Sequence, residues 1–368
     1  MTRVLDTERE VTAAGKVPGR APLRLGPASG VFRLRPLLVL LGGLVVLLVV
    51  FASNVALGEY PISPLGVLST LVGGGDSADR LVVLQLRLPR SLTGLLVGAA
   101  LGLAGAVTQA IIRNPLASPD ILGITHGAGA AATAVIVFGG SLGGVSGLIA
   151  SVGVPIVALL GGVVTGIVLY LLAYRRGVES FRLVLVGVGI NALAVNVTLW
   201  LLTLGDVQDA GRAMVWLTGS LNARGWENAV PVGLALAVLV PVTLIGAHVL
   251  GALQFDDDTM RGLGVRINLS RSVLLLAAVT LASIAAAAAG PIPFVALAVP
   301  QIALRLARTA RPPLLGSMVL GATLVVGADV ISRTVFGTLE LPVGIITAIL
   351  GAPYLIYLIV HRYRRVGS

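Results

Sequence analysis

The 368-residue sequence contains no cysteine, which excludes disulfides, thiolate metal sites and cysteine catalysis. It is also nearly free of lysine, because Lys16 is the only one and lies in a polar N-terminal segment. No glycine-rich loop leads into a lysine, so the chain lacks a phosphate-binding loop. If the protein works with ATP and Mg, a partner subunit would have to bind them. Charged residues make up only 11% and aromatic residues 4%. A soluble protein of this size would need more charge on its surface.

The composition is instead typical of a polytopic membrane protein, with 56% hydrophobic residues, 47 glycines and a mean hydropathy of +0.99. The net charge of +10 does not indicate a nucleic-acid partner, because no basic face with interleaved aromatics occurs. The basic residues lie in short gaps between apolar runs, where they set membrane topology. The lipid bilayer is therefore the first partner that the sequence predicts.

Charge-free runs predict the membrane spans at 36–58, 91–112, 121–174, 183–205, 228–255, 272–304, 312–328 and 341–360. Two of these runs are too long for one crossing. The glycines at 139–144 divide one of them, and the Gly-Pro-Ile-Pro sequence at 290–293 divides the other, so we expect ten transmembrane helices in an all-α fold. Ten crossings place both termini on one side of the membrane.

The basic residues predict which side that is. With cytoplasmic termini, the external face carries only Arg80, Arg87, Arg90, Arg212, Arg224 and Arg333, and every other basic residue is cytoplasmic. We therefore expect a multi-pass protein of the cytoplasmic membrane with residues 1–34 as a disordered cytoplasmic tail and 35–365 as one transmembrane domain. The helix at 91–112 carries Gly94, Gly98 and Gly102 at every fourth position, a pattern that lets another helix approach closely.

Several separated motifs occur in the order found in the FecCD family. They are RLPR at 87–90, Gln109, RNPLA at 113–117, WLTGS at 216–220, Trp226, LGV at 263–265, PFVALAVPQ at 293–301, Asp329 with Arg333, ELPVG at 340–344 and GAP at 351–353. The sequence resembles this family over about residues 36–362. Its members are permease subunits of ABC importers for ferric siderophores, haem and cobalamin. The resemblance implies the type II ABC importer permease fold and transport without enzymatic activity of the chain itself.

The resemblance also implies the partners: a second permease subunit, two ATPase subunits and an extracytoplasmic substrate-binding protein. Pro293, Ala296 and Gln301 replace glycines and a histidine that many members have, and ASPD at 117–120 follows the second span. These departures resemble the ferric-enterobactin-type branch and favour a ferric siderophore over haem or cobalamin. Permeases of that branch usually pair with a different permease, which favours a heterodimer over a homodimer.

Three sets of residues match functional positions of the family. Arg87, Arg90 and Arg333 match arginines that receive acidic residues of the binding protein, a task suited to the bidentate guanidinium. The alternative is that they only snorkel, with Arg333 pairing with Asp329 one turn earlier. Residues at about 255–268 match the coupling helices that fit the ATPase, and we assign this role to Asp256, Asp257, Asp258, Arg261, Gly262, Leu263 and Gly264. Helix capping explains the aspartates equally well.

The third set is a cytoplasmic gate, to which the resemblance assigns Asn114 and Leu116 and, less closely, Ser180 and Phe181. The alternative is that Asn114 and Pro115 merely end a helix. His126 and His248 lie in apolar runs without a second metal-ligand residue at suitable spacing, so we expect hydrogen-bonded interior roles and no metal or other cofactor on this chain. A secondary transporter would need mid-membrane carboxylates, and Asp329 is the only candidate, near an external end. An intramembrane hydrolase would need a nucleophile and base, and no convincing pair occurs.

Overall fold

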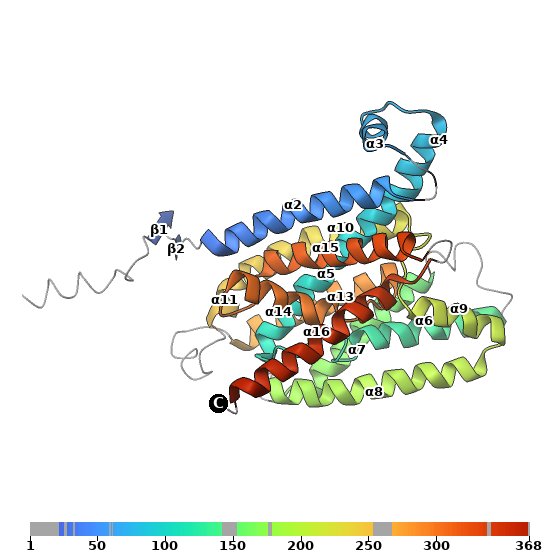
Figure 1. Cartoon of the computed structure of the whole chain (residues 1–368). Helices are drawn as coiled ribbons and strands as arrows, with labels where there is room; N and C mark the ends of the chain where they lie inside the picture. The colour runs from blue at the N-terminus through green and yellow to red at the C-terminus, as the bar shows by residue number, and fades with distance from the viewer. Residues whose placement is uncertain are drawn as a thin grey trace, which may run out of the picture.

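The computed structural model describes residues 22–25, 28–31, 34–58, 60, 62–141, 153–175, 179–252, 267–336 and 340–366. Within them the elements, labelled as in Figure 1, are β1 (Pro22–Leu25), β2 (Ala28–Val31), α2 (Leu34–Ala56), α3 (Pro64–Leu71), α4 (Ser77–Arg80), the π-helix η1 (Leu81–Arg87), α5 (Leu88–Ile112), α6 (Ile124–Ser141), α7 (Val154–Ala173), α8 (Ser180–Leu204), α9 (Val207–Leu217), α10 (Trp226–Ile245), α11 (Ala247–Ala252), α13 (Ile267–Ala289), α14 (Val295–Ala307), α15 (Leu314–Thr334) and α16 (Val343–Val366).

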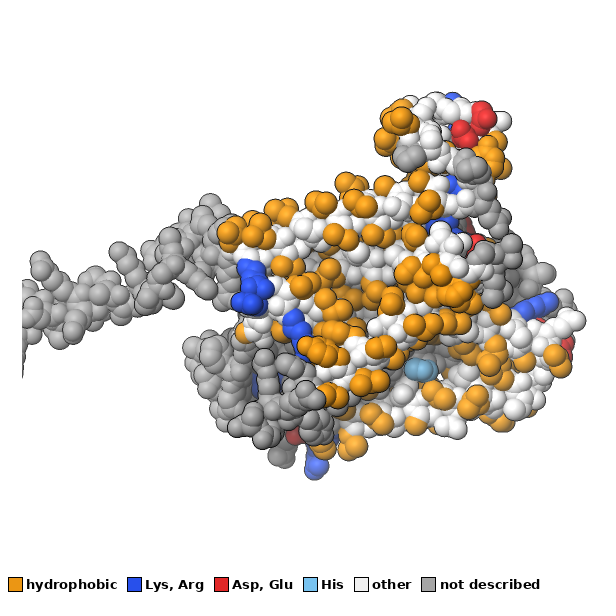
Figure 2. All heavy atoms as spheres, in the orientation of Figure 1, with side chains coloured by type: hydrophobic (Ala, Val, Ile, Leu, Met, Phe, Trp, Pro, Cys, Tyr) orange, Lys and Arg blue, Asp and Glu red, His pale blue; other side chains and the backbone are white. Residues whose placement is uncertain are grey.

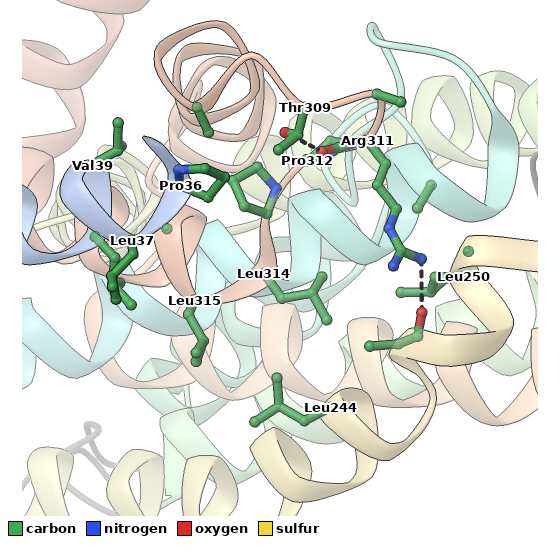
Figure 3. A pocket seen from close by; sticks show the side chains of 18 residues that line it. Pro36, Leu37, Val39, Leu244, Leu250, Thr309, Arg311, Pro312, Leu314 and Leu315 are labelled. Atoms are coloured by element: carbon green, nitrogen blue, oxygen red, sulfur yellow. Dashed lines mark hydrogen bonds between the residues drawn. The ribbon is translucent and has the colours of Figure 1, made fainter. Parts of the chain in front are cut away.

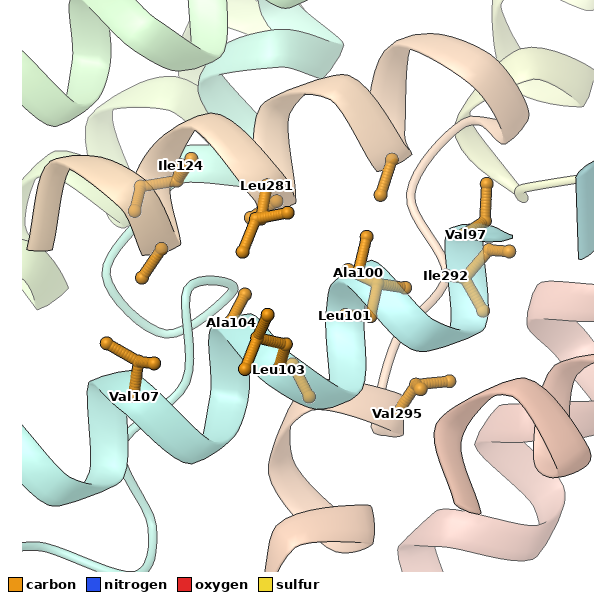
Figure 4. Close-up of a cluster of buried hydrophobic side chains, with 14 of the residues drawn as sticks. Val97, Ala100, Leu101, Leu103, Ala104, Val107, Ile124, Leu281, Ile292 and Val295 are labelled. Carbon is orange, nitrogen blue, oxygen red and sulfur yellow. The ribbon is translucent and has the colours of Figure 1, made fainter. Parts of the chain in front are cut away.

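Helix α5 forms the centre of the helical bundle and packs against α15, α13, α14 and α10. Its small and aliphatic side chains form the middle of the core, where Val97, Leu101 and Leu103 are at most 2% exposed. Figure 4 shows these side chains facing Leu281 of α13 and Val295 of α14. The outer helices, by contrast, carry exposed leucines and valines, which cover much of the surface in Figure 2. Burial of α5 inside a shell of apolar helices is the arrangement expected of a bundle surrounded by lipid.

Seven helical segments are long and apolar enough to cross a membrane, and three shorter apolar helices, α6, α14 and α16, accompany them. Together they occupy the positions of the predicted spans. The two predicted breaks are confirmed, because α6 ends at Ser141 before α7 begins at Val154, and α13 ends at Ala289 before α14 begins at Val295. Helix α2 begins and α16 ends at the same end of the bundle, which we call the termini end (Figure 1). The opposite end is called the far end.

The three glycines of the predicted seam lie against α15 and its surroundings. A Cβ atom at Gly98 would collide with the carbonyl oxygen of Gly321, and one at Gly102 with the carbonyl oxygen of Ser317. At Gly94 the nearest atom to an added Cβ is a methyl group of Leu221, at 2.8 Å. The contact is reciprocal, because a Cβ atom at Gly321 would collide with the carbonyl oxygen of Gly98. The two backbones therefore touch directly, which small residues permit in membrane helices.

The structure differs from the sequence predictions in three places. Strands β1 and β2 form an antiparallel hairpin within the expected disordered tail, of which residues 1–21 lie outside the described part. Helix continues without interruption over Ser77–Ile112, although we expected a span beginning at residue 91. The short helices α3, α4 and α9 also lie between the predicted spans, where no helix was predicted. Each begins at a side-chain cap, from Ser63, Asp76 and Asp206 respectively, so the capping residues were a signal in the sequence.

Candidate functional site

Four arginines line a cavity of about 620 Å³ at the far end of the bundle. Arg87 and Arg90 come from η1 and α5, Arg224 from the loop before α10, and Arg333 from the last turn of α15. Glu227 and Glu340 also line the cavity. The three arginines that the sequence predicted as a docking site are thus brought together, and Arg224 joins them. We call this cavity the arginine cavity.

Arg87 is only 7% exposed and binds the end of α2. Its guanidinium donates to the carbonyl oxygens of Val55 at 3.2 Å and Ala56 at 2.9 Å, and to that of Tyr60. The last carbonyl groups of a helix have no partner within the helix and carry its negative dipole end, so a cation is stabilised there. Arg87 therefore joins the start of α5 to the end of α2.

Asp329 is fully buried and holds two of the arginines. Arg90 donates through two nitrogens to one carboxylate oxygen, at 2.9 and 3.1 Å, and Arg333 lies 3.3 Å from the other oxygen. The side-chain amide of Asn54 in α2 donates to that second oxygen at 2.9 Å. A buried carboxylate is stable only when it is paired and hydrogen-bonded, and here α2, α5 and α15 all supply partners. Arg90 also reaches the exposed Glu340, at 3.3 Å.

These contacts bear on the predicted docking role. The alternative pairing of Arg333 with Asp329 does occur, and the Arg90 and Arg333 side chains are only 12% and 9% exposed. A carboxylate from a binding protein would therefore join arginines that are already engaged within this chain. The docking role itself stays a prediction. What supports it is that the three arginines line the same cavity.

Arg224 is the residue of the arginine cavity that sequence reasoning did not select. Its Nε donates to the carbonyl oxygen of Ser220 at 3.4 Å, and the neighbouring Ala223 has a left-handed backbone conformation with φ of 53°. Burial lowers the pKa of Arg224, and the charge of nearby Glu227 opposes that shift. Arginine stays protonated at neutral pH because its usual pKa is far higher. Its place among the few external arginines was the only sequence signal for it.

A π-helix shapes the wall of the cavity, and Pro89 explains why Trp226 is bound to it. At the end of η1 the N–H of Leu88 donates to the carbonyl of Val83, five residues back. With the same five-residue spacing, the carbonyl of Leu84 would accept from the N–H of residue 89. That residue is Pro89, which has no N–H. The indole N–H of Trp226 donates to the Leu84 carbonyl instead, at 3.2 Å. The side chain thus replaces a backbone hydrogen bond that proline removes.

We expect Trp226→Phe to lower the free energy of unfolding by about 1 kcal/mol, because the carbonyl of Leu84 loses its donor. In a Pro89→Ala background the same change should cost less, since the new N–H at residue 89 can reach that carbonyl. The measurement is a double-mutant cycle on thermal unfolding of the full chain in detergent. Equal costs in both backgrounds would show that the indole hydrogen bond is unrelated to Pro89.

The predicted gate residues lie at the termini end. The side chain of Asn114 accepts from the N–H of Leu116 at 3.0 Å, and Arg113 before it closes α5 in a left-handed conformation. Ser180, the first residue of α8, donates to the carbonyl of Ile111 at 3.4 Å, so it reaches the last turn of α5. Phe181 is 75% exposed. The structure therefore brings Ser180 to the end of α5, close in the chain to Asn114 and Leu116.

The predicted coupling residues Asp256, Asp257, Asp258, Arg261, Gly262, Leu263 and Gly264 all lie outside the described residues. His126 is described, and its Nδ1 atom is buried without a hydrogen-bond partner among the described residues, so the interior hydrogen bond that we expected is not made through this atom. The neighbouring Thr125, at the start of α6, donates to Asp120 at 2.9 Å. Burial raises the pKa of Asp120, and the Thr125 hydrogen bond and the charge of His126 oppose the shift. The side chain of His248 is not among those described.

Comparison with known proteins gives a consistent result. A model of the FecCD transport family matches residues 45–361. The ferric enterobactin transport system permease protein FepG of Escherichia coli is 36% identical, over 84% of this chain and 91% of the relative. The achromobactin transport system permease protein CbrC of Dickeya dadantii is 39% identical, over 86% and 89%. The iron(3+)-hydroxamate import system permease protein FhuG of Bacillus subtilis is 38% identical, over 88% and 97%.

A solved structure of a metal-chelate type ABC transporter in an inward-facing conformation has the same fold. It superposes with a TM-score of 0.75 and 27% sequence identity, and the match covers 88% of this chain and 99% of that one. The all-helical permease fold is thereby confirmed. The match spans nearly the whole of the solved chain, so the helices of this protein are arranged as in that chain.

Proposed function

Since the chain belongs to the FecCD transport family, we propose that it is the transmembrane permease subunit of an ABC importer that moves a ferric siderophore across the cytoplasmic membrane. The observation that carries this proposal is the agreement among relatives. Permeases named for enterobactin, achromobactin and hydroxamate chelates match most of the chain at similar identity. What these cargoes share is iron(3+) bound in an organic chelate, so the proposal names that class and no single chelate.

The proposed orientation places the termini end in the cytoplasm and the arginine cavity outside. The distribution of arginines supports it through the positive-inside rule. In this orientation the arginine cavity faces an extracytoplasmic substrate-binding protein, whose acidic residues would meet Arg87, Arg90, Arg224 and Arg333. Charge complementarity of this kind mainly sets the register and rate of docking. The gate residues at the start of α8 and the end of α5 would then close the pathway on the cytoplasmic side.

The proposed energy source is a separate pair of ATPase subunits. The chain has no phosphate-binding loop, and its single lysine lies in the N-terminal tail. Residues 255–264 would fit a cleft of the ATPase and transmit its closure to the helices. A second permease subunit would complete the pathway, and the ferric-enterobactin-type features favour a different chain over a second copy. The chain itself would hold neither metal nor cofactor, and the iron chelate is its cargo.

The proposal predicts that a strain lacking this permease loses uptake of at least one ferric siderophore, whereas uptake of haem and cobalamin continues. The measurement is accumulation of radiolabelled ferric chelates, haem and cobalamin, with the gene restored on a plasmid as control. A matched control restores the permease in a strain that also lacks the ATPase gene. Uptake should stay absent there, because this chain cannot bind ATP alone. Loss of haem or cobalamin uptake alone would reject the ferric siderophore as cargo.

A further inference from the structure

A small projection at the far end, formed by α3 and α4, carries an apolar surface that lies outside the arginine cavity (Figure 1). Leu65, Leu68, Leu71 and Val72 are between 46% and 86% exposed. Leu68 is three or four residues from each of the other three, so all four lie on one side of the helix. We call these four residues the α3 stripe. The sequence from residue 60 to residue 75 contains no charged residue, so the stripe is uncharged throughout.

The projection is held in shape by polar contacts at both ends of α3. The side chain of Ser63 accepts a hydrogen bond from the N–H of Gly66 at 3.0 Å and caps the start of the helix. Beyond its end, Arg80 of α4 donates to the carbonyl oxygens of Gly73 at 2.5 Å and Gly74 at 3.0 Å. The α3 stripe is therefore presented by a fixed element.

The side of α3 opposite the stripe packs against the bundle. Ile62, just before the helix, and Val67 within it are buried in one apolar cluster with Val55 of α2 and Val83 of η1. Val55 lies in the last turn of α2. The depth at which α2 ends in the membrane therefore sets the depth of α3.

Helix α2 is long enough to cross the bilayer once. Its 23 residues rise about 34 Å, compared with a hydrocarbon core of about 30 Å. At the termini end, Pro36 and Leu37 line a cavity together with Leu314 of α15 (Figure 3), so these two candidate spans begin at the same level. The other end of α2 then lies at the opposite boundary of the hydrocarbon. Helix α3 lies at this boundary, because it packs against the last turn of α2.

The direction of α3 fits such a boundary. Figure 1 shows α3 end-on whereas α2 runs across the view, so α3 lies across α2 and along the plane of a membrane that α2 crosses. Figure 2 shows hydrophobic side chains on the side of the projection that faces back toward the termini end, over α3. The acidic side chains of Asp76 and Asp79 lie over α4. The apolar side of the projection thus faces the bilayer, and its charged side faces water.

The surface that adjoins the projection is the lipid-facing side of α2. Val45, Leu48 and Val49 are between 58% and 68% exposed, and only 6% of the most apolar stretch of α2 is buried. Such a surface is stable in hydrocarbon and unfavourable in water. The α3 stripe continues this apolar surface at the level where the hydrocarbon ends.

We propose that α3 is an interfacial helix, whose stripe enters the boundary between headgroups and acyl chains in the lipid leaflet at the far end. Amphipathic helices that lie in the membrane plane bury their apolar side at this depth. A binding protein that docks through acidic residues would find no partner on the uncharged stripe. The proposal concerns the leaflet at the far end, whichever side of the cell that is. It therefore depends neither on the proposed orientation nor on the chelate.

The test places a single nitroxide label on the stripe, which is direct because the native chain has no cysteine. Leu68→Cys and Val72→Cys are labelled separately in the full chain and reconstituted in nanodiscs of dioleoylphosphatidylcholine. Both positions are exposed, so labelling removes no buried contact. Electron paramagnetic resonance measures collisions of the label with oxygen, which concentrates in hydrocarbon, and with a nickel chelate, which stays in water. We expect the ratio of oxygen to nickel collisions to be several-fold higher on the stripe than in water.

Two labelled variants provide the references for this ratio. Leu48→Cys on the exposed side of α2 gives the value in lipid, and Ala78→Cys on exposed α4 gives the value in water. Leu68 and Val72 should resemble Leu48. A ratio equal to that of Ala78 would place the stripe in water and overturn the proposal. Few collisions with either reagent would mean that protein covers the stripe, as in contact with a second copy of the chain, and would overturn it as well.

Discussion

Gly98→Ala is expected to separate α5 from α15 and to cost about 3 kcal/mol of stability, although it adds a single methyl group. The methyl would meet the carbonyl oxygen of Gly321 and also lie 2.8 Å from the Cα atom of Ala322. These are backbone atoms, which cannot move aside as a flexible side chain can. The measurement is the thermal unfolding midpoint of the full chain in detergent, followed by size-exclusion chromatography.

The matched control for this change is Gly42→Ala in α2. An added Cβ at Gly42 meets nothing within 4 Å, so the chain should fold as before and gain slightly from the better helix propensity of alanine. A Gly98 variant as stable as the Gly42 variant would mean that the backbones of α5 and α15 do not touch in the protein.

Asp329→Ala is expected to be comparably damaging, with a loss of about 3–5 kcal/mol, because it leaves Arg90 and Arg333 buried without this carboxylate. Asn54 would lose one of its acceptors in the same step. The matched control is Glu340→Ala, which removes the other carboxylate bound to Arg90. That side chain is 43% exposed, so its pair should contribute no more than about 1 kcal/mol.

Both variants are compared by the amount of folded protein in the membrane and by the unfolding midpoint in detergent. A Glu340 variant as damaged as the Asp329 variant would show that burial does not govern these ion pairs. A double variant, Asp329→Ala with Arg333→Ala, should recover part of the loss, since one of the two unpaired cations is removed with its partner.

The sequence predicted the helices of this bundle well, because long apolar runs and glycine-proline breaks are local signals. The breaks at 139–144 and 290–293 both separate helices in the structure. The helical stretch before residue 91 was missed because Arg87 and Pro89 are usual signs of a helix end. In the structure the Arg87 guanidinium is hydrogen-bonded to carbonyl groups at the end of α2, and the π-helix η1 accommodates Pro89. The first reason depends on residues of α2, about 30 positions away in the chain, and the second on a π-helix that a local pattern does not reveal.

The candidate site was likewise predictable from the sequence only in part. The residue types of the arginine cavity were evident from the sequence, since arginines on the external side oppose the usual charge bias. Their partners were only partly evident, because Arg333 and Asp329 are one turn apart whereas Arg90 and Asp329 are 239 positions apart. Asn54 gave no signal within its apolar run. A pairing that folding creates between distant helices leaves no pattern in a single sequence.

The direct contact between the backbones of α5 and α15 also has a mechanical consequence. Helices slide past one another when the side chains between them can exchange positions, and here no layer of side chains separates Gly98 from Gly321. The two helices should therefore travel as one rigid body during transport. Any bending or sliding that opens a pathway then falls to the other helices of the bundle. The glycines thus predict that α5 and α15 stay fixed to each other while other helices of the bundle move.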